Sequence, residues 1–185
     1  MPGPARVSRQ IAASALTLFL FVCNPVPGQT AGVPEDIRLD AVGGGEPFVL
    51  SEHRGEYVAL HFLLKTECPY CIRHTWEYSE NASSLPGVVQ VFIKPDSEEE
   101  ISAWMENLPE DGKLSFPIYR DPGAGLAEKL GIPGGYPFHG QVVHYPALVL
   151  LGPGGKEVFR YVGESNRDRY SFDQLKAKLE ELTKD

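Results

Sequence analysis

Two cysteines three residues apart are the residues of this sequence best suited to covalent chemistry. Cys68 and Cys71 enclose Pro69 and Tyr70, which gives the motif Cys-Pro-Tyr-Cys. A thiolate attacks a disulfide bond, and a second cysteine one helical turn away can then attack the mixed disulfide that forms. The motif therefore predicts a thiol–disulfide redox centre in which Cys68 is the nucleophile and Cys71 is the resolving cysteine.

The segment after Cys68 must make that cysteine acidic enough to react. Residues 69–79 contain no glycine and no proline beyond Pro69, which predicts a helix that begins at the cysteines. Unpaired N–H groups and the dipole at a helix N-terminus lower the pKa of a cysteine. Pro69 suits the first turn because it has no N–H group to satisfy, and the Tyr70 ring is placed to contact a bound peptide. We expect both residues to position substrate without taking part in the chemistry.

A metal site is the main alternative use of two cysteines at this spacing. Structural zinc takes four ligands, and the sequence has no second pair of cysteines, so distant histidines would have to supply the rest. The candidates are His61, His74, His139 and His144. A covalent haem needs a histidine directly after the second cysteine, where this chain has Ile72. We expect neither a metal nor another cofactor.

A buried strand before the cysteines is the first element that must position them. Residues 57–64 read YVALHFLL, a nearly continuous apolar run that is typical of a central strand covered on both faces. Similar runs and helix-start signals follow along the chain. Strands are expected at residues 88–93, 116–119, 147–151 and 157–162, and helices at residues 97–108, 121–131 and from 171 onward.

Short local signals set several of these boundaries. Serine with Glu or Gln three residues later forms capping boxes at residues 97–100 and 171–174. Asp121 and Pro122 supply an N-cap and a first helical residue. The glycine-rich turn at residues 152–156 is short enough to make its two strands an antiparallel hairpin.

An additional hairpin is expected at the amino-terminal side of the main sheet. The short segments Ile37–Leu39 and Phe48–Leu50 flank the glycine run at residues 43–45. Together the elements predict an α/β fold with a central mixed sheet flanked by helices and an amino-terminal β-hairpin extension. The cysteines are expected at the end of the central strand.

The first 28 residues have the pattern of a secretory signal peptide. Arg6 and Arg9 precede an apolar run that ends at Cys23 and is too short to span a bilayer as a permanent helix. Lipid attachment at Cys23 is the less favoured alternative, because Val22 before it is bulkier than the small residue that such processing prefers. We predict an exported protein, periplasmic or secreted, with no permanent membrane span after cleavage.

The remaining chain divides into a polar lead-in, residues 29–36, and one domain, residues 37–185. The full chain has 17 basic and 25 acidic residues. Loss of the two signal-peptide arginines leaves 15 basic residues, a formal charge of −10 that argues against nucleic acid as a partner. Cleavage also leaves Cys68 and Cys71 as the only cysteines, so none is spare for a structural disulfide.

The cysteine motif after a buried strand, the pair Tyr145-Pro146 ahead of another strand, and the GPGGK turn together resemble the thioredoxin superfamily, especially redoxin and TlpA-like exported proteins. The resemblance covers roughly residues 35–183 and implies a thioredoxin-like domain. It also implies that Pro146 is a cis-proline packed against the cysteines, which would leave the Tyr145 backbone free to pair with a bound peptide. Protein or small thiol and disulfide substrates follow from the same resemblance.

His61 stands where the resemblance places a buried acid that helps to move protons at the resolving cysteine. A histidine there could act as a base near neutral pH. The alternative is a core histidine satisfied by a backbone carbonyl. The sequence leaves both open.

Residues 116–131 resemble the peroxiredoxin (AhpC/TSA) branch, so a thiol peroxidase is the main alternative function. That branch uses Pro-x-x-x-Thr-x-x-Cys to bind peroxide, whereas His61 and Lys65 occupy those positions before Cys68. If Cys71 were the attacking cysteine, Leu64 and Cys68 would occupy them. The peroxide-binding motif is absent in either register.

Two further features leave alternatives open. A Sco-like copper-handling protein binds metal with two cysteines and a distant histidine, for which His139 or His144 are candidates, although that family has a longer cysteine spacing. The Gly/Pro-rich residues 132–145 predict an unusually long loop near the cysteines, either selecting substrate or forming an insertion without function. The motif does not set the direction of electron transfer.

Overall fold

The computed structural model describes residues 33–34, 36–65, 68–106, 108 and 114–184, together with Met1 and Gly3. Apart from Met1 and Gly3, the predicted signal peptide, including Cys23, lies outside these residues, as does most of the lead-in at residues 29–36. Within the described part of the chain, no helix has the length and hydropathy needed to cross a membrane.

A five-stranded mixed sheet forms the centre of the domain, as the sequence predicts. Its strand order is β5-β4-β3-β8-β9. Strand β3 is parallel to β4 and antiparallel to β8, while β4 and β5 are parallel and β8 and β9 antiparallel. The bounds are β3 Tyr57–Phe62, β4 Val88–Lys94, β5 Ile118–Arg120, β8 Ala147–Leu151 and β9 Glu157–Val162.

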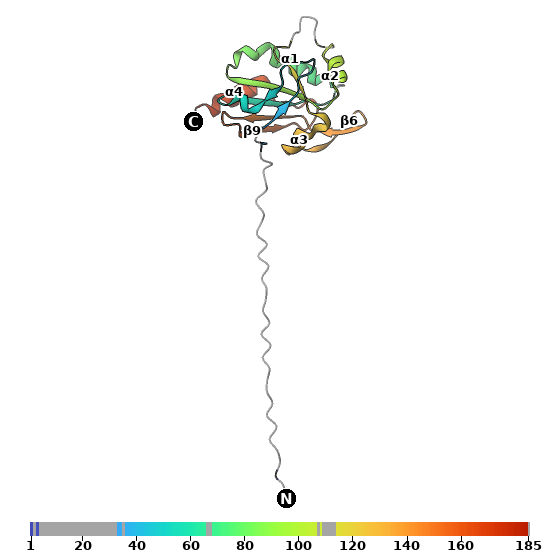
Figure 1. Cartoon of the computed structure of the whole chain (residues 1–185), viewed down its shortest axis with the longest axis vertical. Helices are drawn as coiled ribbons and strands as arrows, with labels where there is room; N and C mark the ends of the chain where they lie inside the picture. Colours follow the sequence, from blue (N-terminus) through green and yellow to red (C-terminus); the bar gives the residue numbers. More distant parts are fainter. Residues whose placement is uncertain are drawn as a thin grey trace.

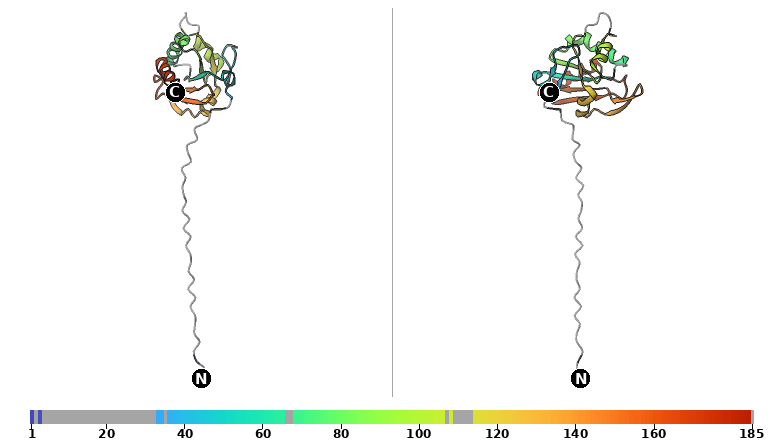
Figure 2. Two further views of the ribbon diagram at one scale, coloured as in Figure 1. Left: turned by 90° about the vertical axis from the view of Figure 1, so that its left-hand side faces the viewer. Right: turned by 45° about the vertical axis from the view of Figure 1, so that its right-hand side comes forward.

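Helices cover both faces of this sheet (Figures 1 and 2). Their bounds are α1 Pro69–Asn81, α2 Glu98–Met105, α3 Gly125–Lys129 and α4 Phe172–Leu182. In Figure 1, α1 and α2 lie above the sheet and α3 lies below it. The predicted capping boxes at Ser97 and Ser171 are both present at the starts of α2 and α4.

Strand β3 alternates between two hydrophobic clusters because successive side chains of a strand point to opposite faces. Ala59 packs in the cluster that also holds side chains of α1, α2 and α4, here called the α1-side core. Val58 and Leu60 pack in the second cluster with side chains of α3, here called the α3-side core. Burial on both faces explains why the strand reads as a continuous apolar run.

The predicted amino-terminal hairpin is present. Strands β1 (Arg38–Leu39) and β2 (Phe48–Val49) pair antiparallel, and a 3-10 helix, η1 (Leu50–His53), follows. Phe48 packs in the α3-side core. A second 3-10 helix, η2 (Ala82–Ser84), continues from the end of α1.

The segment after β5 differs from the continuous helix predicted at residues 121–131. A 3-10 turn, η3 (Pro122–Ala124), precedes α3, and its last two residues, Gly123 and Ala124, have positive φ angles of 68° and 59° that break the helix. The Asp121 carboxylate reaches across this kink and accepts hydrogen bonds from the N–H groups of Leu126 and Ala127 at 2.8 and 3.0 Å. Asp121 therefore caps α3 from a distance rather than as its N-cap residue.

Residues 132–145, predicted as a long loop, contain a second hairpin. Strands β6 (Gly134–Phe138) and β7 (Gln141–His144) pair antiparallel. The turn residues His139 and Gly140 have φ angles of 46° and 77°, the left-handed backbone that a tight two-residue hairpin turn requires. The glycine and proline content of this segment thus serves a hairpin with a bulge, not an irregular connection.

Candidate active site

The two cysteines lie at the N-terminus of α1, as predicted. Cys68 is the N-cap residue and Pro69 occupies the first helical position. The backbone N–H of Cys71 donates to Sγ of Cys68 at 3.2 Å. Both cysteines are free thiols and both are fully buried. The helix start therefore holds the two sulfur atoms within one turn of each other and shields them from solvent.

A guanidinium group that the sequence analysis missed contacts both sulfur atoms. Nη2 of Arg169 lies 3.4 Å from Sγ of Cys68 and 3.1 Å from Sγ of Cys71. A positive charge at this distance stabilises a thiolate. Arg169 is about a hundred residues from the cysteines and precedes α4, so only the folded topology brings it to them. An arginine in a loop of an acidic chain carries no local signal of such a role.

The loop that carries Arg169 is held in place by several hydrogen bonds. Nε of Arg169 donates to the carbonyl of Asn166 at 3.1 Å, and the N–H of Asn166 donates to the Tyr136 hydroxyl at 2.9 Å. Asp168 accepts from the Tyr161 hydroxyl, and its other oxygen accepts from the N–H of Glu164 at 2.8 Å. The guanidinium is thus positioned before any substrate binds.

The electrostatics of the pair favour one negative charge. Burial alone would raise the pKa of Cys71, but the hydrogen bond from Cys68 and the Arg169 guanidinium lower it to about 6. The hydrogen bond with Cys71 and burial raise the pKa of Cys68. The helix terminus alone predicts Cys68 as the acidic cysteine, whereas the folded site places the lower pKa at Cys71. The two thiols share a proton beneath the guanidinium.

Tyr70 lies beside a second arginine of the same loop. The Arg167 guanidinium carbon lies 5.2 Å from the centre of the Tyr70 ring, the geometry of a cation–π contact. Tyr70 is half-buried, and Arg167 is exposed. Tyr70, between the cysteines, therefore contacts the loop that carries Arg169.

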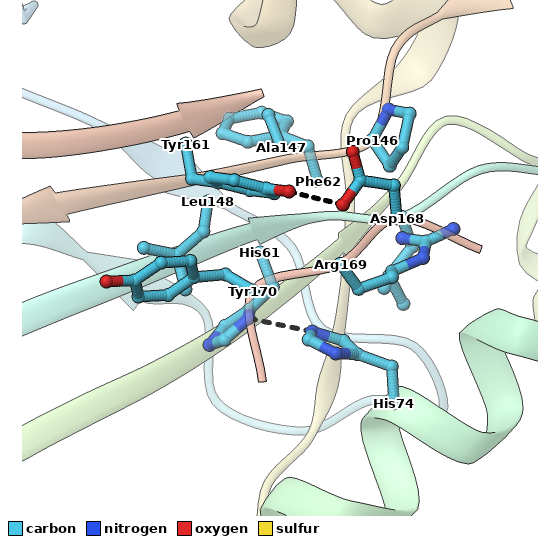
Figure 3. Close-up of a pocket in the computed structure, with 11 residues that line it drawn as sticks. His61, Phe62, His74, Pro146, Ala147, Leu148, Tyr161, Asp168, Arg169 and Tyr170 are labelled. Carbon is cyan, nitrogen blue, oxygen red and sulfur yellow. Dashed lines mark hydrogen bonds between the residues drawn. The ribbon is translucent and has the colours of Figure 1, made fainter. Parts of the chain in front are cut away.

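His61 lies in the α1-side core with both ring nitrogens engaged. Its Nδ1 lies 3.1 Å from Nε2 of His74, and its Nε2 lies 2.8 Å from Oε1 of Gln90. Figure 3 shows the two histidines pointing toward each other from β3 and α1. Burial lowers the pKa of His61 to about 3 and holds the pKa of His74 well below its usual value. Side chains rather than a backbone carbonyl satisfy His61.

A small cavity adjoins this histidine pair. Its volume is about 10 Å³, close to what one water molecule needs. The lining includes His61, His74, Pro146, Asp168 and Arg169, seen together in Figure 3. The cavity links the histidines to the loop that holds the guanidinium.

Pro146 lines this cavity, but its expected geometry is not observed. No peptide bond among the described residues is cis, so the Tyr145–Pro146 bond is trans. The N–H of Tyr145 donates to the carbonyl of Pro133 at 2.8 Å, and the carbonyl of Tyr145 lies 2.7 Å from Nδ1 of His144. The prediction of a free Tyr145 backbone is wrong, because the β6–β7 hairpin folds back and supplies its partner.

The β6–β7 hairpin lies beside the cysteines, as the loop was expected to. Phe138 is buried in the same cluster as both cysteines. Nζ of Lys65, three residues before Cys68, donates to Oε1 of Gln141 at 2.8 Å. His139 is exposed at the hairpin turn, and His144 is buried. Among the described residues, no group of three or more His, Cys, Asp or Glu side chains is placed to hold a metal ion.

Comparison with models of known protein families identifies the family of this chain. The model of the AhpC/TSA family matches residues 32–158. The chain belongs to the AhpC/TSA family. Membership of the AhpC/TSA family indicates a redoxin and, in general terms, an oxidoreductase. No curated protein matches the chain.

Solved structures similar to this AhpC/TSA chain include both peroxidases and disulfide-exchange proteins. Peroxidoxin BcpB from Mycobacterium tuberculosis is 18% identical, with 80% of this chain and 93% of that chain covered and a TM-score of 0.63. The exposed lipoprotein thioredoxin Etrx1 from Streptococcus pneumoniae is 22% identical, with 79% and 98% covered and a TM-score of 0.59. A thiol:disulfide interchange protein DsbE from Chlorobium tepidum, described as putative, is 19% identical, with 82% and 94% covered and a TM-score of 0.58. At these identities the likeness shows the fold, which is thioredoxin-like.

Proposed function

We propose that this AhpC/TSA protein is a thiol–disulfide oxidoreductase that works through Cys68 and Cys71. One observation carries the proposal: two free thiols one helical turn apart share a single guanidinium, with Sγ of Cys68 and of Cys71 at 3.4 and 3.1 Å from Nη2 of Arg169. Such a pair can hold one thiolate in the reduced form and can close to a disulfide in the oxidised form.

The reaction transfers two electrons from the pair to a substrate disulfide. The proton that the two thiols share passes to Cys71 as the Cys68 thiolate attacks one substrate sulfur. The substrate S–S bond breaks, and the first substrate thiolate leaves and takes that proton from Cys71. Cys71 then attacks Sγ of Cys68, the mixed disulfide breaks, and the second substrate thiolate leaves. The products are the Cys68–Cys71 disulfide and a reduced substrate, and the reverse sequence oxidises a dithiol.

The order of attack is supported by where the two sulfur atoms lie. Cys68 is the N-cap residue, before the first turn of α1, whereas Sγ of Cys71 lies 3.9 Å from the carbonyl oxygen of Leu64 in the interior. We assign Cys68 as the nucleophile for that reason. The lowered pKa of Cys71 suits the second step, because a resolving cysteine must itself attack as a thiolate.

The remaining site residues act on substrate position. Tyr70 is half-buried beside the pair, and Pro69 fixes the first turn of α1. Pro146 lines the cavity beside Arg169, so its role here is to shape that cavity. Proton transfer through His61 would have to pass along His74, its hydrogen-bond partner on α1.

Thiol peroxidase activity is the second candidate function, because the family includes peroxiredoxins and peroxidoxin BcpB is among the similar structures. The positions that hold proline and threonine in the peroxide-binding motif carry His61 and Lys65. His61 is buried against His74, and Lys65 is bonded to Gln141. Neither offers the threonine hydroxyl that the motif uses.

We place this activity outside the cytoplasm, with protein or small thiol and disulfide substrates. The signal-peptide pattern of residues 1–28 supports export, and a similar structure is that of an exposed lipoprotein. Fractionation of cells that express the full chain tests the location: recovery of a shortened chain outside the cytoplasm is expected. Full-length chain in the cytoplasm would contradict it.

The decisive experiment is a redox titration of the mature protein against glutathione, followed by stopped-flow mixing of its reduced form with hydrogen peroxide. We expect a single two-electron transition and slow peroxide consumption. Fast, stoichiometric peroxide consumption would establish the peroxidase instead. Cys71→Ser should accumulate mixed disulfides with substrate, and Cys68→Ser should accumulate none; equal trapping by the two variants would contradict the assigned order.

A further inference from the structure

A fully buried lysine lies behind the cysteines and takes no part in the reaction described above. Lys94 is the last residue of β4 and has no exposed surface. Its Nζ donates to the carbonyl oxygen of Leu64 at 2.6 Å, lies 3.4 Å from a carboxylate oxygen of Asp96, and stands 4.7 Å from the centre of the Trp104 ring. Lysine is rarely buried to this degree.

The carbonyl of Leu64 joins this lysine to the redox pair. It accepts from Nζ of Lys94 at 2.6 Å, and Sγ of Cys71 lies 3.9 Å from the same oxygen. One acceptor atom therefore separates a buried ammonium group from the resolving sulfur. In a buried setting, a charge at this range acts more strongly than it would in water.

Asp96 is the charge that opposes Lys94. It is buried, and it lies one residue beyond Pro95 at the end of β4. Burial raises the pKa of Asp96, and the neighbouring Lys94 and Lys65 counteract that rise. Asp96 contacts Lys94 rather than the Leu64 carbonyl. Its negative charge therefore affects the sulfur atoms by offsetting the positive charge of Lys94.

We propose that Lys94 and Asp96 form a buried charge pair that sets the redox equilibrium of Cys68 and Cys71, Lys94 favouring the reduced form and Asp96 opposing it. Lys94 is a positioning residue: it holds the Leu64 carbonyl against Cys71 and supplies the charge behind it. The reduced pair carries a negative charge that the disulfide lacks, so a buried positive charge stabilises the reduced state alone. The Lys94 charge also lowers the pKa of Cys71. This inference rests on the proposed disulfide exchange.

The balanced reaction gives the sign of the effect. The protein disulfide and two glutathione molecules yield the protein dithiol and glutathione disulfide. Lys94→Met removes the charge but keeps an unbranched side chain, so we expect the thiolate pKa to rise by about one unit. With the pKa of Cys71 rising from about 6 to about 7, the equilibrium constant for this reduction at pH 7 should fall about fivefold. Asp96→Asn removes the opposing charge and should shift both quantities the other way, by roughly half as many pKa units.

Two measurements on each variant test the proposal. The thiolate pKa is taken from the 240 nm absorbance difference between reduced and oxidised protein across pH, and the equilibrium constant from glutathione titration. Lys129→Met is the matched control, because it makes the same charge change at an exposed position on α3, and neither quantity should move. Circular dichroism of the oxidised forms shows whether the fold is kept.

Shifts of opposite sign in Lys94→Met and Asp96→Asn support the charge pair. Shifts in the same direction, or no shift in either, would overturn it, because a merely structural role does not change sign with charge. If Lys94→Met does not fold, Asp96→Asn decides alone, since its thiolate pKa must fall. The absorbance pKa needs no exchange reaction, so it tests Lys94 even if glutathione titration shows no transition and the proposed function fails.

Discussion

Replacing Arg169 by methionine removes the charge that contacts both sulfur atoms and keeps much of the side-chain volume. A hydrogen bond to a charged group contributes about 1.5–3 kcal/mol, and 1.36 kcal/mol corresponds to about one pKa unit. The substitution should therefore raise the pKa of Cys71 from about 6 to roughly 7–8. At pH 7 the thiolate fraction would fall from about nine-tenths to between one-half and one-tenth.

The 240 nm absorbance of the reduced variant measures this shift directly, because it needs no reagent to enter the buried site. Arg169→Lys keeps the charge without the planar fork and should give an intermediate pKa. Arg167→Met is the matched control, because that arginine belongs to the same loop but lies over the Tyr70 ring. A midpoint for Arg169→Met within about 0.3 units of the wild type, on the one-unit scale of a charge contact, would refute the assignment of Arg169 as the thiolate partner.

Three other changes test the site through stability and access. The depressed pKa of Cys71 adds to the free energy of unfolding of the reduced protein. This addition is fully present above the ordinary thiol value of 9.0 and is lost as pH falls through about 6. Unfolding in denaturant should show this pH dependence in the reduced form alone, and equal dependence in the oxidised form would contradict it. The pKa of His61 is also depressed, from 6.5 to about 3. The free energy of unfolding should therefore fall by roughly 3 kcal/mol between pH 6.5 and pH 4, because the unfolded chain binds a proton that the buried ring does not. His61→Phe should flatten the free energy of unfolding over that range, and an unchanged slope would argue against a buried neutral ring. Phe138→Ala should lower the free energy of unfolding by about 3 kcal/mol and speed alkylation of the cysteines, whereas an unchanged alkylation rate would show that the β6–β7 hairpin does not cover them.

Local signals explain most of what the sequence predicted correctly. The strands at residues 147–151 and 157–162 were predicted at their observed bounds, because a short glycine-rich turn and apolar runs define them without reference to the rest of the chain. The capping boxes at Ser97 and Ser171 are equally local, since each joins groups three residues apart. The cysteine motif also predicts the start of α1, because Pro69 is suited to the first helical turn.

The missed features depend on contacts between distant segments. Arg169 lies in the loop before α4 and contacts the cysteines at the start of α1, about a hundred residues away in the chain, and no spacing rule connects them. The hydrogen bonding of the Tyr145 backbone depends on how the β6–β7 hairpin folds back. The glycine and proline content of residues 132–145 predicted a loop there instead. The pair His139-Gly140 was the available signal, since a glycine in a two-residue turn marks a hairpin. The kink at Gly123 could not be predicted from the sequence, because an aspartate such as Asp121 can cap a helix that begins directly after it or one that begins a few residues later.

The hydrogen bond from the Tyr145 N–H to the Pro133 carbonyl has a kinetic consequence. A polypeptide that docks by strand pairing at this edge must first separate the chain's own segment from it. Association would then be gated by that opening rather than by diffusion. The observed rate constant should level off as substrate concentration rises, and the plateau equals the opening frequency. Under the proposed function, the hairpin would set a ceiling on turnover with protein substrates that dock at this edge, and no excess of substrate would exceed it.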